Sequence, residues 1–245
     1  FFREKIEVIH DGINTQIACP NPNAQLRLKT QSGSEIKLTC NDEIVTFVNR
    51  NLEPYRGFHI FMRAVPEILK QRPNVRILIL GDSEKGYGAS PSPSKYGQKT
   101  WREIFTSEVS PTISADDWSR VHFLGKVSYS NFLSIMQLSS VHVYLSYPFV
   151  MSWSLLEAMS AGAAVVASST GPVLEVIEGD FNGELVNFFD QVDLALRVCR
   201  LLKEADRRMY LSTNARQTII ESYDLHGICL PKQVDWVNRI AKSRD

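Results

Sequence analysis

Apolar residues along the chain alternate between a spacing typical of strands and a spacing typical of helices. Several short runs are apolar at successive positions, as expected of strands buried on both faces of a parallel sheet. Between them, apolar residues recur every three or four positions at 58–69 and 194–202, as in helices that cover a sheet. The alternation predicts an α/β fold, a Rossmann-like and mostly parallel sheet with helices on both faces. The predicted strands are 5–9, 44–49, 75–80, 121–124, 141–145, 163–167 and 184–186.

Three segments depart from this alternation. Residues 26–39, with Gly33 at the centre, predict a polar hairpin before the second main strand. Residues 82–118 form a long insertion at the carboxyl end of a predicted strand, where ligands bind in open α/β sheets. We expect this insertion to be either a lid or specificity loop, or a solvated excursion with a short helix near 100–109. Residues 223–245 predict a helical tail, and we expect its last helix to pack across the domain or to reach another one.

Composition and charge narrow the classes of function. The chain has 245 residues, of which 44% are hydrophobic, enough for one large domain. Its 27 basic and 27 acidic residues give a net charge of +0, so we expect no nucleic-acid partner, and any bound anion must be met by local groups. No apolar run approaches the ~18 residues of a membrane span. The cysteines lie far apart without a Cys-x-x-Cys pair, which disfavours a zinc site or a disulfide framework and suggests a cytoplasmic location; they are Cys19, Cys40, Cys199 and Cys229.

Residues 150–167 are the most informative segment, because a polar loop leads there into a helix that ends at a glycine before a β-branched strand. A helix that begins near Ser152 presents unpaired backbone N–H groups, to which phosphates bind. Ser152 and Ser154 could bind phosphate or simply cap the helix. Glu157 is the only charged residue inside the helix and points back toward its N-terminus, where it can accept hydrogen bonds from a ribose. The alternative is a structural partner, such as His142 or a backbone amide.

Two arginines upstream of this segment supply fixed positive charge. Arg50 ends a predicted strand and Arg56 follows six residues later, immediately before Gly57, so both can lie at the carboxyl edge of the sheet. Each charge-assisted hydrogen bond to a phosphate contributes roughly 1.5–3 kcal/mol. One of the arginines could instead form a surface ion pair with Glu53 or Glu67. Together with the helix N-terminus, the pair predicts a site for a nucleotide-diphosphate sugar.

Four pieces of sequence, in this order and over nearly the whole chain, resemble a known family. They are Ile-His-Asp-Gly-Ile-Asn at 9–14, the arginine pair, Phe-Leu-Gly-Lys-Val at 123–127, and Ser-Leu-Leu-Glu-Ala-Met at 154–159 followed by Gly162. The chain resembles the carboxyl-terminal domain of the family 4 (group 1) retaining glycosyltransferases of GT-B fold. The resemblance implies that 1–245 is the donor-binding half, and that the acceptor domain, with any membrane association, belongs to a missing amino-terminal half.

The resemblance also implies roles for individual residues. The arginines hold the donor diphosphate, although the family usually has a lysine at the second position. Backbone amides at the start of the helix contact the distal phosphate, the glutamate reads the ribose, and the loop after 124 holds the base through backbone groups. The implied donor-binding residues are Arg50, Arg56, Gly125, Val127, Ser152, Trp153, Ser154, Leu155 and Glu157.

One position departs from the family pattern. The family has a second glutamate eight residues before Glu157, and here that position is Phe149. That glutamate usually contacts hydroxyls of the transferred sugar, so its replacement leaves recognition of the sugar open. Tyr147 and Phe149 could together form an apolar wall against a modified sugar, or could belong to the core.

The resemblance implies chemistry without a metal or a cofactor, because cationic and amide donors stabilise the departing diphosphate. Catalytic groups would lie on the absent domain, so none is assigned here, and we expect this domain alone to bind donor and turn over little. Two other classes stay open, a non-catalytic nucleotide-binding or assembly module and a GT-B epimerase. A dehydrogenase is disfavoured because no Gly-x-Gly-x-x-Gly follows the first strand. The base, the sugar and the acceptor are not predicted.

Overall fold

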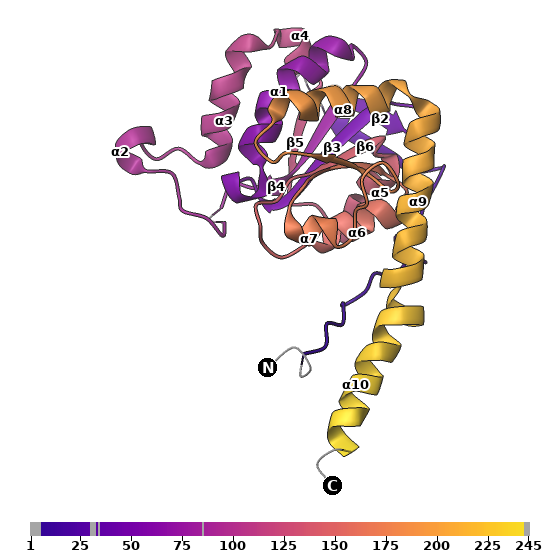
Figure 1. The fold of residues 1–245 in the computed structure, drawn as a ribbon. Coiled ribbons are helices and arrows are strands. Elements are labelled where there is room, and N and C mark those ends of the chain that lie inside the picture. Colours follow the sequence, from indigo (N-terminus) through magenta and orange to yellow (C-terminus); the bar gives the residue numbers. More distant parts are fainter. Residues whose placement is uncertain (1–5, 30–32, 34, 85, 243–245) are drawn as a thin grey trace.

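The computed structural model describes residues 6–29, 33, 35–84 and 86–242. Within these residues, six parallel strands form the main sheet in the order β5-β4-β3-β6-β7-β8 (Figure 1). All six were predicted, with boundaries that differ by at most two residues, which confirms the Rossmann-like parallel sheet. The strands are β3 (Ile44–Asn51), β4 (Arg76–Asp82), β5 (Val121–Gly125), β6 (Val141–Tyr144), β7 (Ala164–Ser168) and β8 (Glu184–Val186).

Helices cover both faces of this sheet, as predicted (Figure 1). One face packs on α1 (Phe58–Gln71), α3 (Trp101–Val109) and α8 (Gln191–Lys203). The other face packs on α5 (Tyr129–Leu138), α6 (Trp153–Ser160) and α9 (Ala205–Tyr223). Because successive residues of a strand point to opposite faces, both faces need apolar side chains, which explains the uninterrupted apolar runs in the sequence.

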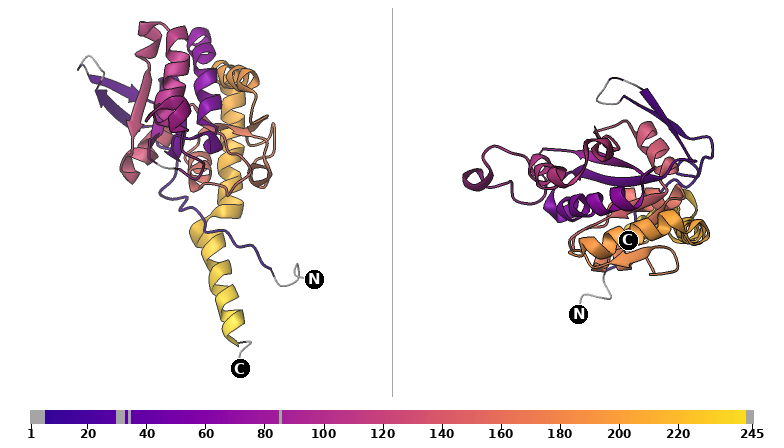
Figure 2. Two further views of the ribbon diagram at one scale, coloured as in Figure 1. Left: turned by 90° about the vertical axis from the view of Figure 1, so that its left-hand side faces the viewer. Right: turned by 90° about the horizontal axis from the view of Figure 1, so that it is seen from above.

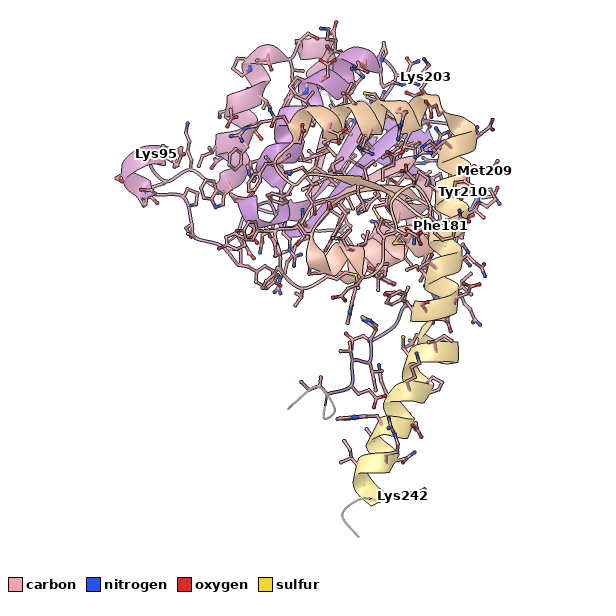
Figure 3. The ribbon with its side chains drawn as sticks, viewed as in Figure 1. Lys95, Phe181, Lys203, Met209, Tyr210 and Lys242 are labelled. Carbon is pink, nitrogen blue, oxygen red and sulfur yellow. The ribbon has the colours of Figure 1, made fainter. Side chains whose placement is uncertain are left out.

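The hairpin and the long insertion lie outside the sheet. β1 (Gln25–Lys29) and β2 (Glu35–Thr39) pair antiparallel, which confirms the hairpin, although only Gly33 of its predicted centre is among the described residues. The insertion contains α2 (Pro93–Tyr96), α3, the 3₁₀ turn η3 (Ser110–Thr112) and α4 (Ala115–Trp118). The predicted helix near 100–109 is α3, which the Thr100 side chain caps. Lys95 marks the outer tip of this excursion (Figure 3).

The two ends of the described chain differ from the sequence predictions. The predicted strand at 5–9 was wrong for residues 6–9, which form no strand, and Lys5 lies outside the described residues. Ile13 pairs with the backbone that follows α9, since its N–H donates to the carbonyl of Tyr223 over 2.8 Å. This pairing takes the place of a sheet partner and directs the N-terminal segment away from the strands.

The predicted tail is helical, but its last helix does not pack across the domain, and the alternative that it reaches another domain stays a prediction. After α9 the chain passes through a π-helical turn, η4 (Leu225–Cys229), into α10 (Leu230–Lys242). α10 continues away from the body of the domain (Figures 1 and 2) and has no buried residue in the described part of the tail. It lies beside the N-terminal segment, where Gln233 donates to the carbonyl of His10 over 2.9 Å. No described helix combines the length and the apolarity that crossing a bilayer requires.

Candidate functional site

The strand order reverses between β3 and β6, and a crevice opens at the carboxyl ends of these neighbouring strands. The chain leaves β3 through the turn η2 (Pro54–Arg56) and leaves β6 through the loop before α6. Gly57 lets the two connections approach, because a Cβ atom there would lie 2.2 Å from the Cβ of Leu145. A cavity of about 230 Å³ lies between them, and its lining residues are Asn49, Arg50, Asn51, Glu53, Arg56, Tyr87, Ser152 and Trp153. The arginine pair and the start of α6 therefore share one cavity.

Arg56 is a buried cation, with 7% of its surface exposed. Its Nη1 donates to Ser146 Oγ over 2.9 Å, to the carbonyl oxygen of Val150 over 3.2 Å and to the hydroxyl of Tyr144 over 3.4 Å. All of these acceptors are neutral. No carboxylate among the described residues forms an ion pair with Arg56, so the surface pair with Glu53 that the sequence allowed is not formed. A buried charge without a counter-ion is costly, which makes this position favourable for a bound anion.

Aromatic rings lie beside the Arg56 guanidinium. Its central carbon is 5.2 Å from the ring of Phe149 and 5.7 Å from the ring of Tyr87, and the two rings are 5.1 Å apart. Tyr147 contacts Tyr55 at 5.8 Å between ring centroids, and both Tyr147 and Phe149 are exposed, so neither belongs to the core. Their suggested role as an apolar wall against a modified sugar stays a prediction. Nothing in the sequence pattern pointed to Tyr87, since it sits in an irregular loop thirty-one positions after Arg56.

The start of α6 shows which of its groups are engaged. Ser152 is the N-cap, and its Oγ accepts from the backbone N–H of Ser154 over 3.3 Å and bonds Ser154 Oγ over 2.9 Å. The backbone N–H of Trp153 has no acceptor among the described residues, which suits an external anion. Leu155 was predicted to bind the donor, but its side chain is buried in the core and its N–H donates to the carbonyl of Ser152. Leu155 therefore serves packing and helix formation.

Glu157 lies one turn into α6 and is half-buried. Its Oε1 accepts from the hydroxyl of Tyr129 over 2.8 Å. Burial raises the pKa of Glu157, and the Tyr129 hydrogen bond opposes that rise only in part. The structural partner suggested by sequence, His142, is fully buried elsewhere and bonds Thr46 over 2.9 Å. Tyr129 was missed, and its only sequence signal was an aromatic residue at the start of the helix after the predicted base loop.

Gly125 ends β5 and Val127 lies in the loop between β5 and α5, and neither lines the Arg56 cavity. Gly125 has a left-handed φ of 64°, so the loop can turn sharply there. Val127 packs beside the core, and Lys126 pairs with Asp82 over 2.7 Å. Because Tyr129 follows two residues later and bonds Glu157, this loop is tied to α6 without being part of the arginine cavity.

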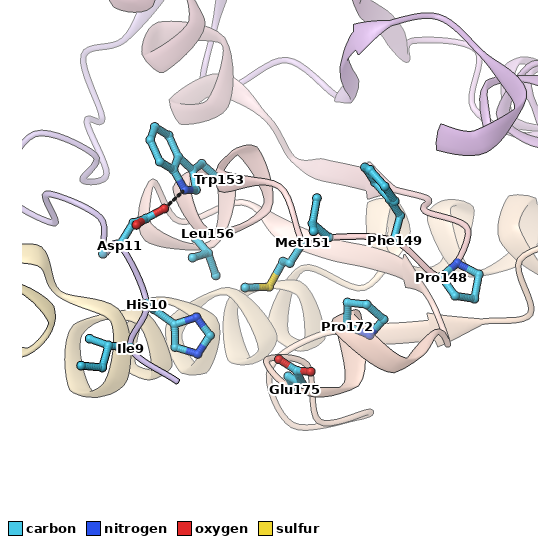
Figure 4. A pocket seen from close by; sticks show the side chains of 12 residues that line it. Ile9, His10, Asp11, Pro148, Phe149, Met151, Trp153, Leu156, Pro172 and Glu175 are labelled. Atoms are coloured by element: carbon cyan, nitrogen blue, oxygen red, sulfur yellow. Dashed lines mark hydrogen bonds between the residues drawn. The ribbon is translucent and has the colours of Figure 1, made fainter. Parts of the chain in front are cut away.

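A larger cavity of about 630 Å³ adjoins the first one at Trp153, which lines both. Its polar groups include Asp11 and Glu175, and Trp153 Nε1 donates to Asp11 over 3.2 Å (Figure 4). Apolar side chains that line the same space include Phe149, Met151, Leu156 and Pro172 (Figure 4). The smaller cavity is thus lined by two arginines and one carboxylate, Glu53, and the larger one by the carboxylates of Asp11 and Glu175 and by apolar side chains.

Metal-ligating groups do not gather in the described part of the chain, where no group of three His, Cys, Asp or Glu side chains could hold an ion. Burial lowers the pKa of His59 and of His122 to about 4, and that of His142 to about 3. These histidines are therefore neutral near pH 7 and belong to the packed core or its edge.

A family model for glycosyl transferases group 1 matches residues 34–218, which is more than half of the chain and includes the sheet and both cavities' main walls. The chain belongs to the group 1 glycosyltransferases. Its assignment to family 4 within that group stays a prediction. The match begins inside the hairpin and ends in α9, so α10 lies outside it.

Relatives of this glycosyltransferase domain are distant in sequence and similar in fold. An uncharacterised glycosyltransferase of Methanocaldococcus jannaschii is 26% identical over 92% of this chain and 52% of its own length. The solved C-terminal domain of a group 1 glycosyl transferase, LpcC of Francisella tularensis, has a TM-score of 0.68 at 20% identity, covering 88% of this chain and 100% of that one. HepE of Anabaena, solved in complex with UDP and glucose, has a TM-score of 0.73 at 19% identity, covering 95% of this chain and 57% of that one. This chain spans about half the length of the curated relatives that it matches.

Proposed function

We propose that this domain is the donor-binding half of a retaining, metal-independent glycosyltransferase whose acceptor half lies outside the chain. The donor is a nucleoside-diphosphate sugar, and its diphosphate binds between Arg50, Arg56 and the first backbone amides of α6. The observation that carries the proposal is the buried Arg56, which has only neutral partners in the described structure and faces a cavity beside the unpaired Trp153 amide. The complex of HepE with UDP and glucose supports a donor of this class.

The chemistry follows from where charge develops. When the bond between sugar and diphosphate breaks, negative charge grows on the leaving group, and fixed cations and N–H groups stabilise it without any proton transfer. In this arrangement Arg56 and the start of α6 act on the leaving group. Glu157, held by Tyr129, accepts from the ribose, and the Gly125–Val127 loop lies on the side of the base. The transferred sugar faces the larger cavity with Asp11 and Glu175.

A non-catalytic nucleotide-binding or assembly module is the second candidate. The observation that favours it is Phe149, which presents a ring to the Arg56 region where the family pattern has a carboxylate. Such a module would bind nucleotides but would not hydrolyse or transfer the sugar, even with an acceptor half supplied.

The experiment is a thermal-shift screen of the purified chain against UDP, GDP, ADP, their common sugar conjugates and inorganic pyrophosphate. A ligand that binds only the folded state raises the midpoint by mass action, so one nucleotide series should stand out. If no compound shifts the midpoint at millimolar concentration, the donor-binding proposal is wrong. Slow hydrolysis of the selected nucleotide sugar would distinguish an enzyme from a binding module.

A further inference from the structure

The long segment after β4 returns to the Arg56 cavity at residues 86–88. Tyr87, from this segment, lines the cavity together with Arg50, Arg56 and Ser152. Its ring contacts both the Arg56 guanidinium and the ring of Phe149, and 56% of its surface is exposed. The segment therefore contributes a side chain to the site, although its α2 part extends away from the body (Figure 1).

Glu53 holds this part of the segment in place. Its carboxylate is buried, with 3% of the residue exposed, and accepts from the backbone N–H of Tyr87 over 3.0 Å and from that of Gly88 over 2.8 Å. The approach is close enough to require glycine, since a Cβ at Gly86 would lie 2.3 Å from the carboxylate carbon of Glu53. A Cβ at Gly88 would lie 2.5 Å from the ring of Tyr55. Backbone contacts of this kind fix where Tyr87 stands.

The Arg56 guanidinium is surrounded by groups that orient it without neutralising it. Nη1 is engaged by Ser146, Val150 and Tyr144 on one side, and the rings of Tyr87 and Phe149 lie within 6 Å of its centre. Aromatic faces attract a cation and displace water from it, yet they leave its formal charge available. A cation held this way loses little freedom when an anion binds, which favours affinity.

We propose that Tyr87 is a positioning residue for Arg56, and that Tyr87 and Phe149 together hold the guanidinium ready for the diphosphate. The inference rests on the proposed function, in which Arg56 binds that diphosphate. It gives a joint role to the 82–118 segment and to the phenylalanine at position 149. Glu53 contributes to this arrangement because it holds the loop that carries Tyr87.

The test is a double-mutant cycle measured by calorimetry, with UDP and inorganic pyrophosphate as probes. The variants are Tyr87→Leu, Arg56→Met and the double variant, and Tyr87→Phe serves as the conservative replacement. Tyr87→Leu should lower the affinity for both probes by about 3- to 30-fold, the range expected for loss of a cation–π contact. Tyr87→Phe should bind both probes like wild type. In the Arg56→Met background, Tyr87→Leu should have no further effect, because its action passes through the arginine.

Tyr96→Leu is the matched control, since Tyr96 lies in the same segment and contacts a cation, Lys95, but does not line the cavity. It should leave both affinities unchanged. Unaltered affinity in Tyr87→Leu, an equal loss in Tyr87→Phe, or additive losses in the double variant would each overturn the inference while leaving the proposed function intact. If Arg56→Met binds like wild type, or if wild type binds neither probe, the proposed function fails and this inference fails with it.

Discussion

Two regions of the domain bury charge in opposite ways. At the β8 edge, the Glu184 side chain is 0% exposed and meets Arg197 over 2.9 Å, Arg207 over 2.8 Å and also Arg200. Burial acts to raise the pKa of Glu184, but the hydrogen bonds from these arginines outweigh it and hold that pKa below its usual range. The charge is satisfied inside the fold, and no ligand is needed to complete it.

The crevice between β3 and β6 shows the other arrangement. Arg56 and Glu157 have only neutral partners there among the described residues, and burial raises the pKa of Glu157 rather than lowering it. Both groups lie near the unpaired start of α6, and Arg56 lines a cavity. Glu184 is thus satisfied by ion pairs within the fold and has a structural role, whereas Arg56 and Glu157, which have neutral partners, are the charges that we propose bind the donor.

The largest expected effect is on the stability of the fold, at Glu184 on the β8 edge. Glu184→Gln should lower the free energy of unfolding by about 3 kcal/mol, because it removes the buried charge that three arginines share. Arg197 and Arg207 keep Asp193 and Asp180 as partners, whereas Arg200 has no other carboxylate partner among the described residues. Urea unfolding measures this change. Glu35→Gln is the control, since Glu35 is exposed and pairs with the exposed Arg27, and it should cost less than about 0.5 kcal/mol. A small effect of Glu184→Gln, or a specific loss of nucleotide affinity, would break the distinction between the two regions.

The next effect is on binding. Arg56→Met should weaken binding of the nucleoside diphosphate selected by the screen by about 1.5–3 kcal/mol, the contribution of a charge-assisted hydrogen bond. Its free energy of unfolding should change by less than about 1 kcal/mol, because the lost hydrogen bonds are offset by removal of a buried charge without a counter-ion. Calorimetry and urea unfolding measure the two quantities on the same protein. Arg27→Met, an exposed arginine on the hairpin, should alter neither.

The sheet and part of the candidate site could be predicted from the sequence. Apolar runs located the six strands because each strand is buried on both faces, and parallel order follows from helices between strands. Arg50, Arg56 and the start of α6 were brought to one edge by a general rule, since parallel strands share their carboxyl ends. These predictions needed only local pattern and topology.

Tyr87, Tyr129 and the anchoring role of Glu53 could not be predicted in this way. Each depends on a contact between segments whose separation is bridged by irregular loops, such as Glu53 with the backbone of Tyr87 and Gly88. The N-terminal segment pairs at Ile13 with the backbone near Tyr223, and at His10 with Gln233 of α10, and neither contact has a signal in hydrophobic periodicity. Long-range contacts made by loops, and not the helices and strands themselves, are therefore what the sequence could not predict.

A smaller effect on binding is expected at Glu157, in the crevice between β3 and β6. Glu157→Gln should weaken the nucleoside diphosphate by about 1 kcal/mol, since an amide is a poorer acceptor than a carboxylate for a ribose hydroxyl, while pyrophosphate affinity stays unchanged. Parallel calorimetric titrations with the two ligands measure the contrast. Equal weakening of both ligands would mean that Glu157 acts on the phosphates or on the fold, and its role as ribose acceptor would be wrong.

The smallest effect is the pH dependence of stability, and its sign separates the two glutamates. A carboxylate whose folded pKa is raised, as for Glu157, contributes stability below its unfolded pKa of about 4.3 and loses it as pH rises through the folded value. Glu184 has a lowered folded pKa, so its contribution is present above about pH 4.3 and is lost as pH falls through the folded value. Urea unfolding from pH 3 to 8 should therefore show that the free energy of unfolding of Glu157→Gln, relative to wild type, increases as pH rises. The same relative free energy should decrease for Glu184→Gln. The same sign for both variants would mean that Glu157 is paired within the fold as Glu184 is, and the contrast between a binding charge and a structural charge would not hold for it.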